Sequence, residues 1–374
     1  MQLPLLRTEW IDPVTKAKGF FVIDKLVNDQ CAGGIRMRQG LECKEIERLA
    51  QTMTLKLKTL GMSCGGSKAG IAYNASAADA LDVLKRFLEA HRAFLLENWS
   101  TSEDLGTKAE DISRIVREMG ISNTFIAAMA KMPQPEQTWV KSEKISSLII
   151  DGLSIGDLAT GYGVAVSTLK SMVLLGMDSN KTHIAIQGFG SVGASAALYL
   201  AKAGCLIVAI ADAEGTIFNQ SGLDIEQLIG LKNRLGIINR TLLSKDHILL
   251  PREVWLELEV DVLIPAAIAD TITLENSSQI KAKLIVEGAN IPTTKEAEKE
   301  LTNRGVYIIP DFIANAGGVG VLGIILDPKV EPTKEGVFGY LNEKIGTTTM
   351  NSLQNALLNG KSVREGALEA LLNN

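Results

Sequence analysis

The chain has few of the residues that build metal centres and disulfide frameworks, although it is 374 residues long. Its four cysteines (Cys31, Cys43, Cys64 and Cys205) are scattered, which disfavours a disulfide framework or a zinc site and suits a reducing compartment. Three histidines are too few for a histidine-based centre, so we expect no metal. Aromatic residues make up only 5% of the chain, which argues against stacking platforms for nucleic acid.

An excess of positive charge and long apolar runs are also missing. The 38 basic residues face 43 acidic ones and form no Lys/Arg run, which disfavours a nucleic-acid partner. No stretch reaches the ~18 apolar residues of a membrane span. The N-terminus has no apolar run behind a basic region, so no signal peptide is expected. We therefore expect a cytoplasmic protein with no nucleic-acid or membrane partner.

Apolar residues are abundant, at 46% of the chain with a mean hydropathy of +0.14, so large cores, a subunit interface or both must bury them. The length predicts two domains. Strands are expected within the first forty residues and helices over 44–60 and 77–97. From about residue 160, apolar strands alternate with helices, which predicts an α/β fold with a parallel sheet covered on both faces. The last residues, from about 334, are expected to be helical.

Residues 188–193 read GFGSVG and lie between an apolar strand and a helix, as a dinucleotide site requires. The first glycine of such a motif makes the turn, the second lets backbone approach the pyrophosphate, and the third lets helix pack on strand. Asp212 ends the next predicted strand and could accept the ribose hydroxyls. The alternative is a tight turn with no ligand. The expected cofactor-binding residues here are Gly188, Gly190, Ser191, Val192, Gly193 and Asp212.

Charge around Asp212 favours NAD over NADP. Glu214 lies close to it, and no Lys or Arg occurs between Lys202 and Lys232. A 2′-phosphate would therefore meet negative charge without a local cation, unless a distant loop supplies one.

Two lysines and an aspartate form a second candidate constellation. Lys56 falls on the apolar stripe of its predicted helix, where a snorkelling lysine is the alternative interpretation. Lys68 lies in the glycine-rich stretch 65–70, which could equally be a flexible surface loop. Asp104 precedes a predicted helix and could be a solvated turn residue. Together, a lysine base, a carboxylate-binding cation and a proton-shuttling aspartate would suit chemistry beside a nicotinamide.

The chain at this point resembles the glutamate/leucine/phenylalanine/valine dehydrogenases. The matching motifs occur in the family's order between residues 33 and 319. They are GGIRM at 33–37, MTLKLKTLGMSCGGSKAGI at 53–71, EDLGT at 103–107, ATGYGV at 159–164, QGFGSVG at 187–193, PAA at 265–267, VEGAN at 286–290 and PDFIANAGGV at 310–319.

The resemblance implies a reversible oxidative deamination of an L-amino acid to its 2-oxo acid and ammonia. It implies that Lys56 binds the substrate α-carboxylate, that Lys68 is the catalytic lysine, and that Asp104 moves protons on and off the amino nitrogen. Gly33 and Gly34 are expected at the substrate. Further residues that match cofactor positions of the family are Thr160, Ala266, Ala267, Asn290 and Asn315.

The sequence departs from the glutamate-specific branch at two positions. Those members resemble one another in having a lysine before the GG-x-R motif and a serine after the ANAGG loop. Here the two positions are Ala32 and Leu322. A distal carboxylate would have no cation there to offset its desolvation, so we expect an apolar substrate side chain. Arg36 or Arg38 could still supply the cation. The alternatives are a glutamate dehydrogenase with an altered pocket and an inactive, nucleotide-binding regulatory paralogue.

The resemblance also predicts the domain organisation. Residues 1–157 and 323–374 are expected to form an α/β substrate-binding and oligomerisation domain. Residues 158–322 are expected to form a Rossmann-type, doubly wound nucleotide domain, with a cleft between the two. Family members assemble through the first domain, so a homo-oligomer is expected.

Overall fold

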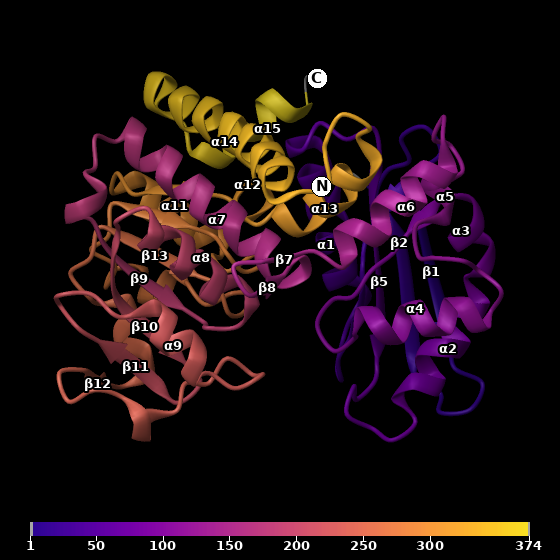
Figure 1. The fold of residues 1–374 in the computed structure, drawn as a ribbon, viewed down its shortest axis with the longest axis horizontal. Helices are drawn as coiled ribbons and strands as arrows, with labels where there is room; N and C mark the ends of the chain where they lie inside the picture. The colour runs from indigo at the N-terminus through magenta and orange to yellow at the C-terminus, as the bar shows by residue number, and fades with distance from the viewer. Residues whose placement is uncertain (1–2, 373–374) are drawn as a thin grey trace. The chain divides into compact units, whose positions relative to one another are not determined.

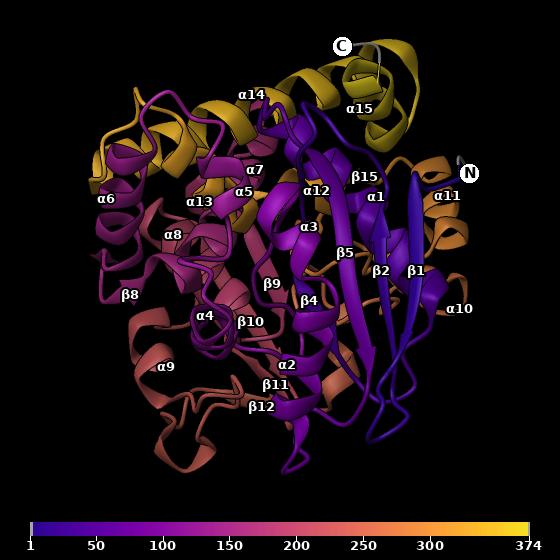
Figure 2. The same cartoon turned by 90° about the vertical axis from the view of Figure 1, so that its right-hand side faces the viewer.

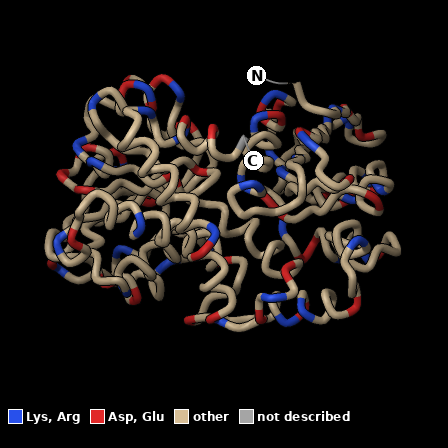
Figure 3. Tube along the Cα trace, turned by 90° about the horizontal axis from the view of Figure 1, so that it is seen from above, with Lys and Arg blue, Asp and Glu red and all other residues tan. Residues whose placement is uncertain are grey.

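A computed structural model describes residues 3–372 and divides the chain into two compact units, 1–142 and 143–374 (Figure 1). Each unit has its own sheet and hydrophobic core. No helix in the described part of the chain is long and apolar enough to cross a membrane. Acidic and basic residues are interspersed along both units (Figure 3).

The first unit is built on a mixed sheet, seen in Figure 2. Its strands follow the order β1-β2-β5-β3-β6, with β4 also paired to β5. β1 and β2 form a hairpin, as the sequence predicts, and β2 pairs antiparallel with β5. The strands are β1 (Leu6–Ile11), β2 (Lys18–Ile23), β3 (Cys31–Ala32), β4 (Ile35–Met37), β5 (Gly65–Ala72) and β6 (Trp99–Ser100).

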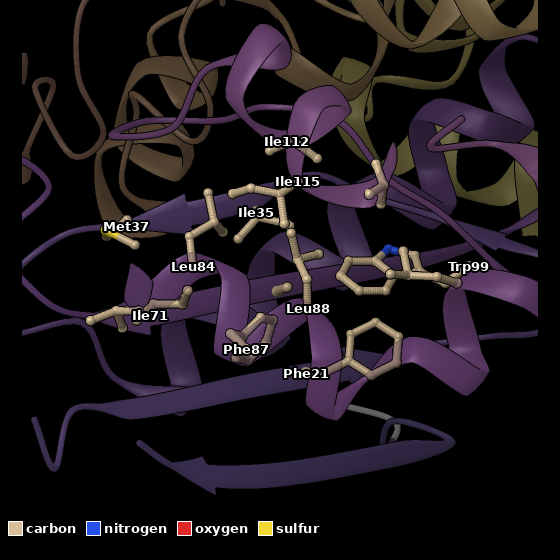
Figure 4. Close-up of a cluster of buried hydrophobic side chains, with 14 of the residues drawn as sticks. Phe21, Ile35, Met37, Ile71, Leu84, Phe87, Leu88, Trp99, Ile112 and Ile115 are labelled. Carbon is tan, nitrogen blue, oxygen red and sulfur yellow. The ribbon is translucent and has the colours of Figure 1, made fainter. Parts of the chain in front are cut away.

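Helices pack on this sheet and enclose an aromatic-rich core, in which Phe21, Phe87 and Trp99 are fully buried (Figure 4). The predicted helix 77–97 is instead two helices that meet at His91. The helices are α1 (Cys43–Thr59), α2 (Ala80–Ala90), α3 (Arg92–Glu97), α4 (Ala109–Glu118), α5 (Ile126–Met129) and α6 (Pro135–Ser146), the last of which continues into the second unit.

The glycine-rich stretch 65–70 is a buried strand, not a loop. A Cβ at Gly66 would lie 2.2 Å from the backbone nitrogen of Thr54, and one at Gly70 would lie 2.4 Å from Ile46 Cδ1. Thr54 and Ile46 belong to α1. The glycines therefore allow α1 to lie directly on β5, which explains their presence without a ligand.

The second unit contains a seven-stranded sheet in the order β12-β11-β10-β9-β13-β14-β15. Strands β10, β9, β13, β14 and β15 run parallel to one another. β11 pairs antiparallel with β10, and β12 pairs antiparallel with β11. The strands are β9 (His183–Gln187), β10 (Leu206–Asp212), β11 (Gly215–Phe218), β12 (Ile248–Leu250), β13 (Val262–Pro265), β14 (Leu284–Val286) and β15 (Tyr307–Ile309); a small separate pair is β7 (Ile149–Ile150) and β8 (Leu153–Ser154).

Helices cover both faces of this sheet (Figures 1 and 2), which confirms the predicted α/β, doubly wound class. The apolar sequences of the parallel strands follow from burial on both faces. The helices are α7 (Ile155–Leu174), α8 (Ser191–Lys202), α9 (Ile225–Leu231), α10 (Leu274–Ser277), α11 (Lys295–Asn303), α12 (Asp311–Ala314), α13 (Gly317–Leu326), α14 (Lys334–Asn359) and α15 (Val363–Leu372).

The compact units differ from the expected domain boundaries. Residues 143–157 and 323–372 pack with the second unit, not with the first. For the C-terminal residues the reason is the long helix α14, which lies along α7 (Figure 1) and buries Leu341 and Ile345. Its Thr349 hydroxyl lies 3.0 Å from that of Ser167 on α7, which adds a buried polar contact.

Candidate active site

The first unit brings Lys68 and Asp104 into contact. Lys68 lies on β5, and Asp104 follows β6 in the segment that leads to α4. The Lys68 Nζ is 2.8 Å from Asp104 Oδ2, and the two side chains are only 7% and 14% exposed. A buried ammonium–carboxylate pair of this kind can exchange protons with a bound substrate.

Arg36 on β4 is a second cation at Asp104, whereas the sequence suggested it only as a possible partner of a distal substrate carboxylate. Its Nε donates to Asp104 Oδ2 at 3.0 Å, and its Nη1 donates to Glu45 at 2.9 Å. Burial alone would raise the pKa of the Asp104 carboxyl, but the charges of Lys68 and Arg36 outweigh it and hold that pKa well below its usual range. Asp104 is therefore held as a carboxylate.

Lys56 lies on the buried face of α1, as its position on the apolar stripe predicts, and is 7% exposed. Gly33 and Gly34 lie tightly against backbone. A Cβ added at Gly33 would lie 1.7 Å from the Ser67 carbonyl oxygen. A Cβ added at Gly34 would lie 2.6 Å from the Glu103 carbonyl oxygen. These glycines thus let the strand that carries Lys68 and the segment that carries Asp104 approach each other.

The second unit places GFGSVG at the end of β9 and the start of α8, as predicted. Gly188 adopts a positive φ of 90°, and a Cβ at Gly193 would lie 1.9 Å from the Gly188 carbonyl oxygen. A Cβ at Gly190 meets nothing within 4 Å, so there is free space on the side of the turn where a side chain would point. The turn and the first backbone N–H groups of the 12-residue helix α8 fit the pyrophosphate of a dinucleotide.

The other predicted cofactor residues gather at the same edge of the sheet. The Asn315 side chain donates to the carbonyls of Gly288 and Ala289 and, at 3.2 Å, to Asn290 Oδ1. A Cβ at Gly188 would meet Ala266 and Ala267, and one at Gly318 would lie 2.6 Å from Thr160 Oγ1. Carboxyl ends of parallel strands are where open α/β sheets bind ligands.

Asp212 is not the free acceptor that the sequence predicts. Arg240, from 28 positions further along the chain, forms a bidentate pair with it. The backbone nitrogens of Glu214 and Ile238 also donate to Asp212, so each carboxylate oxygen already accepts two hydrogen bonds. The loop after α9 folds back onto β10 and thus supplies the cation from a distant loop that the sequence left open.

Two further groups lie at the glycine turn. Ser191 Oγ donates to Asp157 Oδ1 at 2.6 Å, so a carboxylate from α7 stands at the N-terminus of α8. A Cβ at Gly236 would lie 2.7 Å from the Gly190 nitrogen, so the loop anchored by Arg240 touches the turn. Neither contact had a signal in the local sequence.

The proposed pocket residues lie in different units. Ala32 is buried on β3 in the first unit, and Leu322 is half-buried on α13 in the second. An apolar pocket built from both stays a prediction.

Comparison with known proteins matches both units to one family. The family described as Glutamate/Leucine/Phenylalanine/Valine dehydrogenase matches residues 152–373, and its dimerisation domain matches residues 11–121. A glutamate dehydrogenase of Thermotoga maritima is 34% identical over 310 residues, which is 81% of this chain and 70% of that protein. A glutamate dehydrogenase of Aeropyrum pernix is 35% identical, over 77% of this chain and 66% of its own length. The NAD-specific glutamate dehydrogenase of Staphylococcus aureus is 30% identical, over 77% and 67%.

Solved structures share the fold over almost the whole chain. The hetero-hexameric glutamate dehydrogenase of Thermus thermophilus, in a leucine-bound form, aligns with a TM-score of 0.79 at 22% identity and covers 99% of this chain and 88% of its own. The glutamate dehydrogenase of Peptoniphilus asaccharolyticus aligns with a TM-score of 0.71 at 25% identity, over 98% and 90%. With both family segments matched and relatives above 30% identity, the chain belongs to the Glu/Leu/Phe/Val dehydrogenase family.

Proposed function

We propose that this protein is an NAD(P)-dependent L-amino-acid dehydrogenase. The observation that carries the proposal is the buried Lys68–Asp104 pair, at 2.8 Å, in a unit that also buries Lys56. The reaction converts an L-amino acid, NAD(P)⁺ and water into a 2-oxo acid, ammonium, NAD(P)H and a proton. When bound, NAD(P)⁺ accepts the hydride from Cα of the amino acid.

The chain's own residues supply charge and proton transfer. Lys56 binds the substrate α-carboxylate through its ammonium group. Lys68 takes a proton from the water that replaces the amino group, and Asp104 exchanges protons with the departing nitrogen. In the absence of substrate the two groups hold each other as ammonium and carboxylate, so binding has to separate them before Lys68 can act as a base.

We favour a substrate with an apolar side chain. Ala32 offers no charge, and the two arginines that could replace a missing lysine are already paired: Arg36 with Asp104 and Glu45, and Arg38 with Glu45 at 2.6 Å. A γ-carboxylate would have to break these pairs to gain a cation. Glutamate is the second candidate substrate, because the relatives at 30–35% identity are named glutamate dehydrogenases.

A panel of L-amino acids, assayed for NAD(P)H production, tests the proposal. Leu, Val, Ile, Met or Phe is expected to give the highest kcat/KM. Glutamate as clearly the best substrate would overturn the apolar assignment and leave the dehydrogenase assignment standing. No turnover with any amino acid, together with NAD(P)H binding, would favour the nucleotide-binding regulatory paralogue.

The Asp212–Arg240 pair bears on the cofactor. NAD stays our proposed cofactor, because Asp212 already holds Arg240 in a bidentate pair. A 2′-phosphate could gain this guanidinium only by breaking that pair, so NADP should be the poorer cofactor. Replacement of Arg240 by Gln is expected to lower kcat/KM for NADP at least tenfold and to change that for NAD much less. Equal losses with both cofactors would show that Arg240 only anchors its loop.

The expected homo-oligomer is also part of the proposal. The family segment that matches residues 11–121 is described as a dimerisation domain. Analytical ultracentrifugation of the full chain tests it, with a monomer at micromolar concentration as the contradicting result.

A further inference from the structure

A largely buried group of charges joins the last helix to the cofactor edge of the second unit. Arg364 on α15 donates from Nε to both oxygens of Glu298 on α11, at 2.9 and 2.7 Å. Its Nη2 donates to Glu287 at 2.9 Å, and its Nη1 lies 3.7 Å from Asp311 Oδ1. One guanidinium therefore lies against three carboxylates. We call Arg364 and these three acidic residues the Arg364 cluster.

The charge balance makes Arg364 indispensable to this group. The Glu287 and Asp311 side chains are 0% and 2% exposed, so their carboxylates depend on protein partners rather than on bulk water. Burial raises the pKa of Glu287 to about 7, although Arg364 opposes this effect. Without Arg364, three acidic groups would share a dry site with no cation, and they would have to move apart or take up protons.

Hydrogen bonds connect the cluster to both cofactor loops. Glu287 accepts from the backbone nitrogen of Asp311 at 2.9 Å, and Asp311 Oδ2 accepts from the backbone nitrogen of Ile291 at 2.9 Å. Glu287 is followed by the loop that carries Asn290, and Asp311 begins the helix that leads to Asn315. The cluster therefore fixes the spacing of the two loops whose asparagines contact each other.

Ile291 has a backbone conformation that needs such support. Its φ is +51°, in the left-handed region, which is strongly disfavoured for a β-branched residue. Two hydrogen bonds hold it there: its nitrogen donates to Asp311, and its carbonyl accepts from the nitrogen of Asp270 at 2.9 Å. Strain of this kind persists only where the surroundings enforce it, and it is common at ligand sites.

We propose that Arg364 is a positioning residue for the cofactor site. It orients Asp311, Asp311 holds Ile291 in the left-handed conformation, and Ile291 sets the direction of the neighbouring Asn290. The C-terminal helix α15 thereby becomes part of the nucleotide site without touching the ligand. This inference rests on the proposed function, because it takes the Asn290 loop to bind NAD(P).

The test uses the full chain and measures the dissociation constant of NADH and NADPH by fluorescence titration. Arg364→Gln is expected to weaken binding at least tenfold. Adding Ile291→Gly to that variant is expected to restore a large part of the loss, because glycine adopts a positive φ without steric cost. The matched control is Lys361→Gln, just before α15, whose partner Glu369 lies outside the cluster; it should bind as the wild type does.

The outcomes separate this inference from the proposed function. A wild type that binds neither cofactor contradicts the proposed function. If the wild type binds the cofactor, either of two results overturns the positioning role. One is that Arg364→Gln binds equally well, and the other is that Ile291→Gly does not restore binding. If Arg364→Gln does not fold, Arg364→Lys replaces it, since lysine keeps the charge but cannot reach three carboxylates in a fork; the same loss and the same rescue are expected.

Discussion

At Asp104, burial and ion pairing act on one carboxyl group in opposite directions. Burial favours the neutral acid, whereas Lys68 at 2.8 Å and Arg36 at 3.0 Å favour the carboxylate, and the cations prevail. A residue that exchanges protons with an amine benefits from this arrangement, because substrate binding can withdraw Lys68 and thereby raise the proton affinity of Asp104.

Arg36→Gln should therefore move the pH dependence of the reaction. With one cation removed, the pKa of Asp104 rises. Activity that needs the ionised carboxylate is then lost at a higher pH on the acid side, while the alkaline side stays in place. The kcat/KM profile against pH measures this. Arg38→Gln is the control, because Arg38 contacts Glu45 but not Asp104; the same shift in both variants would refute a direct effect of Arg36.

Lys68→Ala should lower kcat by at least a thousandfold and leave NAD(P)H binding intact, because the lysine lies in the unit without the glycine turn. Steady-state kinetics and a cofactor titration on the same preparation are the measurements. Lys44→Ala, exposed on α1, serves as the control and should keep wild-type kcat. A Lys68→Ala enzyme that retains a tenth of the activity would contradict the assigned role.

At the scale of elements, close packing explains several glycines without a ligand. The contact between α1 and β5 places Lys56 and Lys68, one on each element, in the same unit. The fit depends on missing side chains at Gly66 and Gly70. The same principle operates between α7 and α8, where a Cβ at Gly161 would lie 2.4 Å from the Val192 carbonyl oxygen.

Gly66→Ala is expected to lower the free energy of unfolding by about 1–3 kcal/mol, since overpacking displaces α1 from β5. It should also reduce turnover, because Lys56 moves with the helix. Urea denaturation and kcat/KM are measured together. Gly230→Ala on α9 provides the comparison: its Cβ would meet nothing within 4 Å, so stability should be unchanged or slightly higher. Equal stability of both variants would argue against the packing explanation.

For the whole molecule, two separate cores imply two regions that can respond differently to ligands. The first core gathers around Phe21, Phe87 and Trp99, and the second around Ile285, Leu263 and Trp255. The predicted cofactor residues all lie in the second unit, and Lys56, Lys68 and Asp104 all lie in the first.

Hydrogen exchange with and without NAD(P)H should show this division. Added protection is expected in peptides that cover 188–193, 287–291 and 310–316, because ligand binding stabilises the segments it contacts. Peptides from the core strands of the first unit, such as β2 and β5, should exchange at unchanged rates. Protection spread evenly over both units would contradict the assignment of cofactor binding to the second.

The sequence alone determined the fold class, the family motifs and the candidate pair Lys68 and Asp104. These features depend on local patterns: apolar strands buried on both faces, glycines at fixed spacing, and motifs in a fixed order. The lysine on the apolar stripe of α1 was predictable for the same reason, since a helix repeats every 3.6 residues.

Only the tertiary structure decided which charges neutralise which. Arg36 reaches Asp104 across 68 positions, Arg240 reaches Asp212 across 28, and Arg364 reaches Glu287 across 77. Tertiary packing also decided where the C-terminal helices belong, because α14 packs on α7 and thereby lies in the second unit. Ion pairs and helix docking act through space between residues far apart in the chain, so no local pattern encodes them; secondary structure and glycine turns are set by neighbours along the chain.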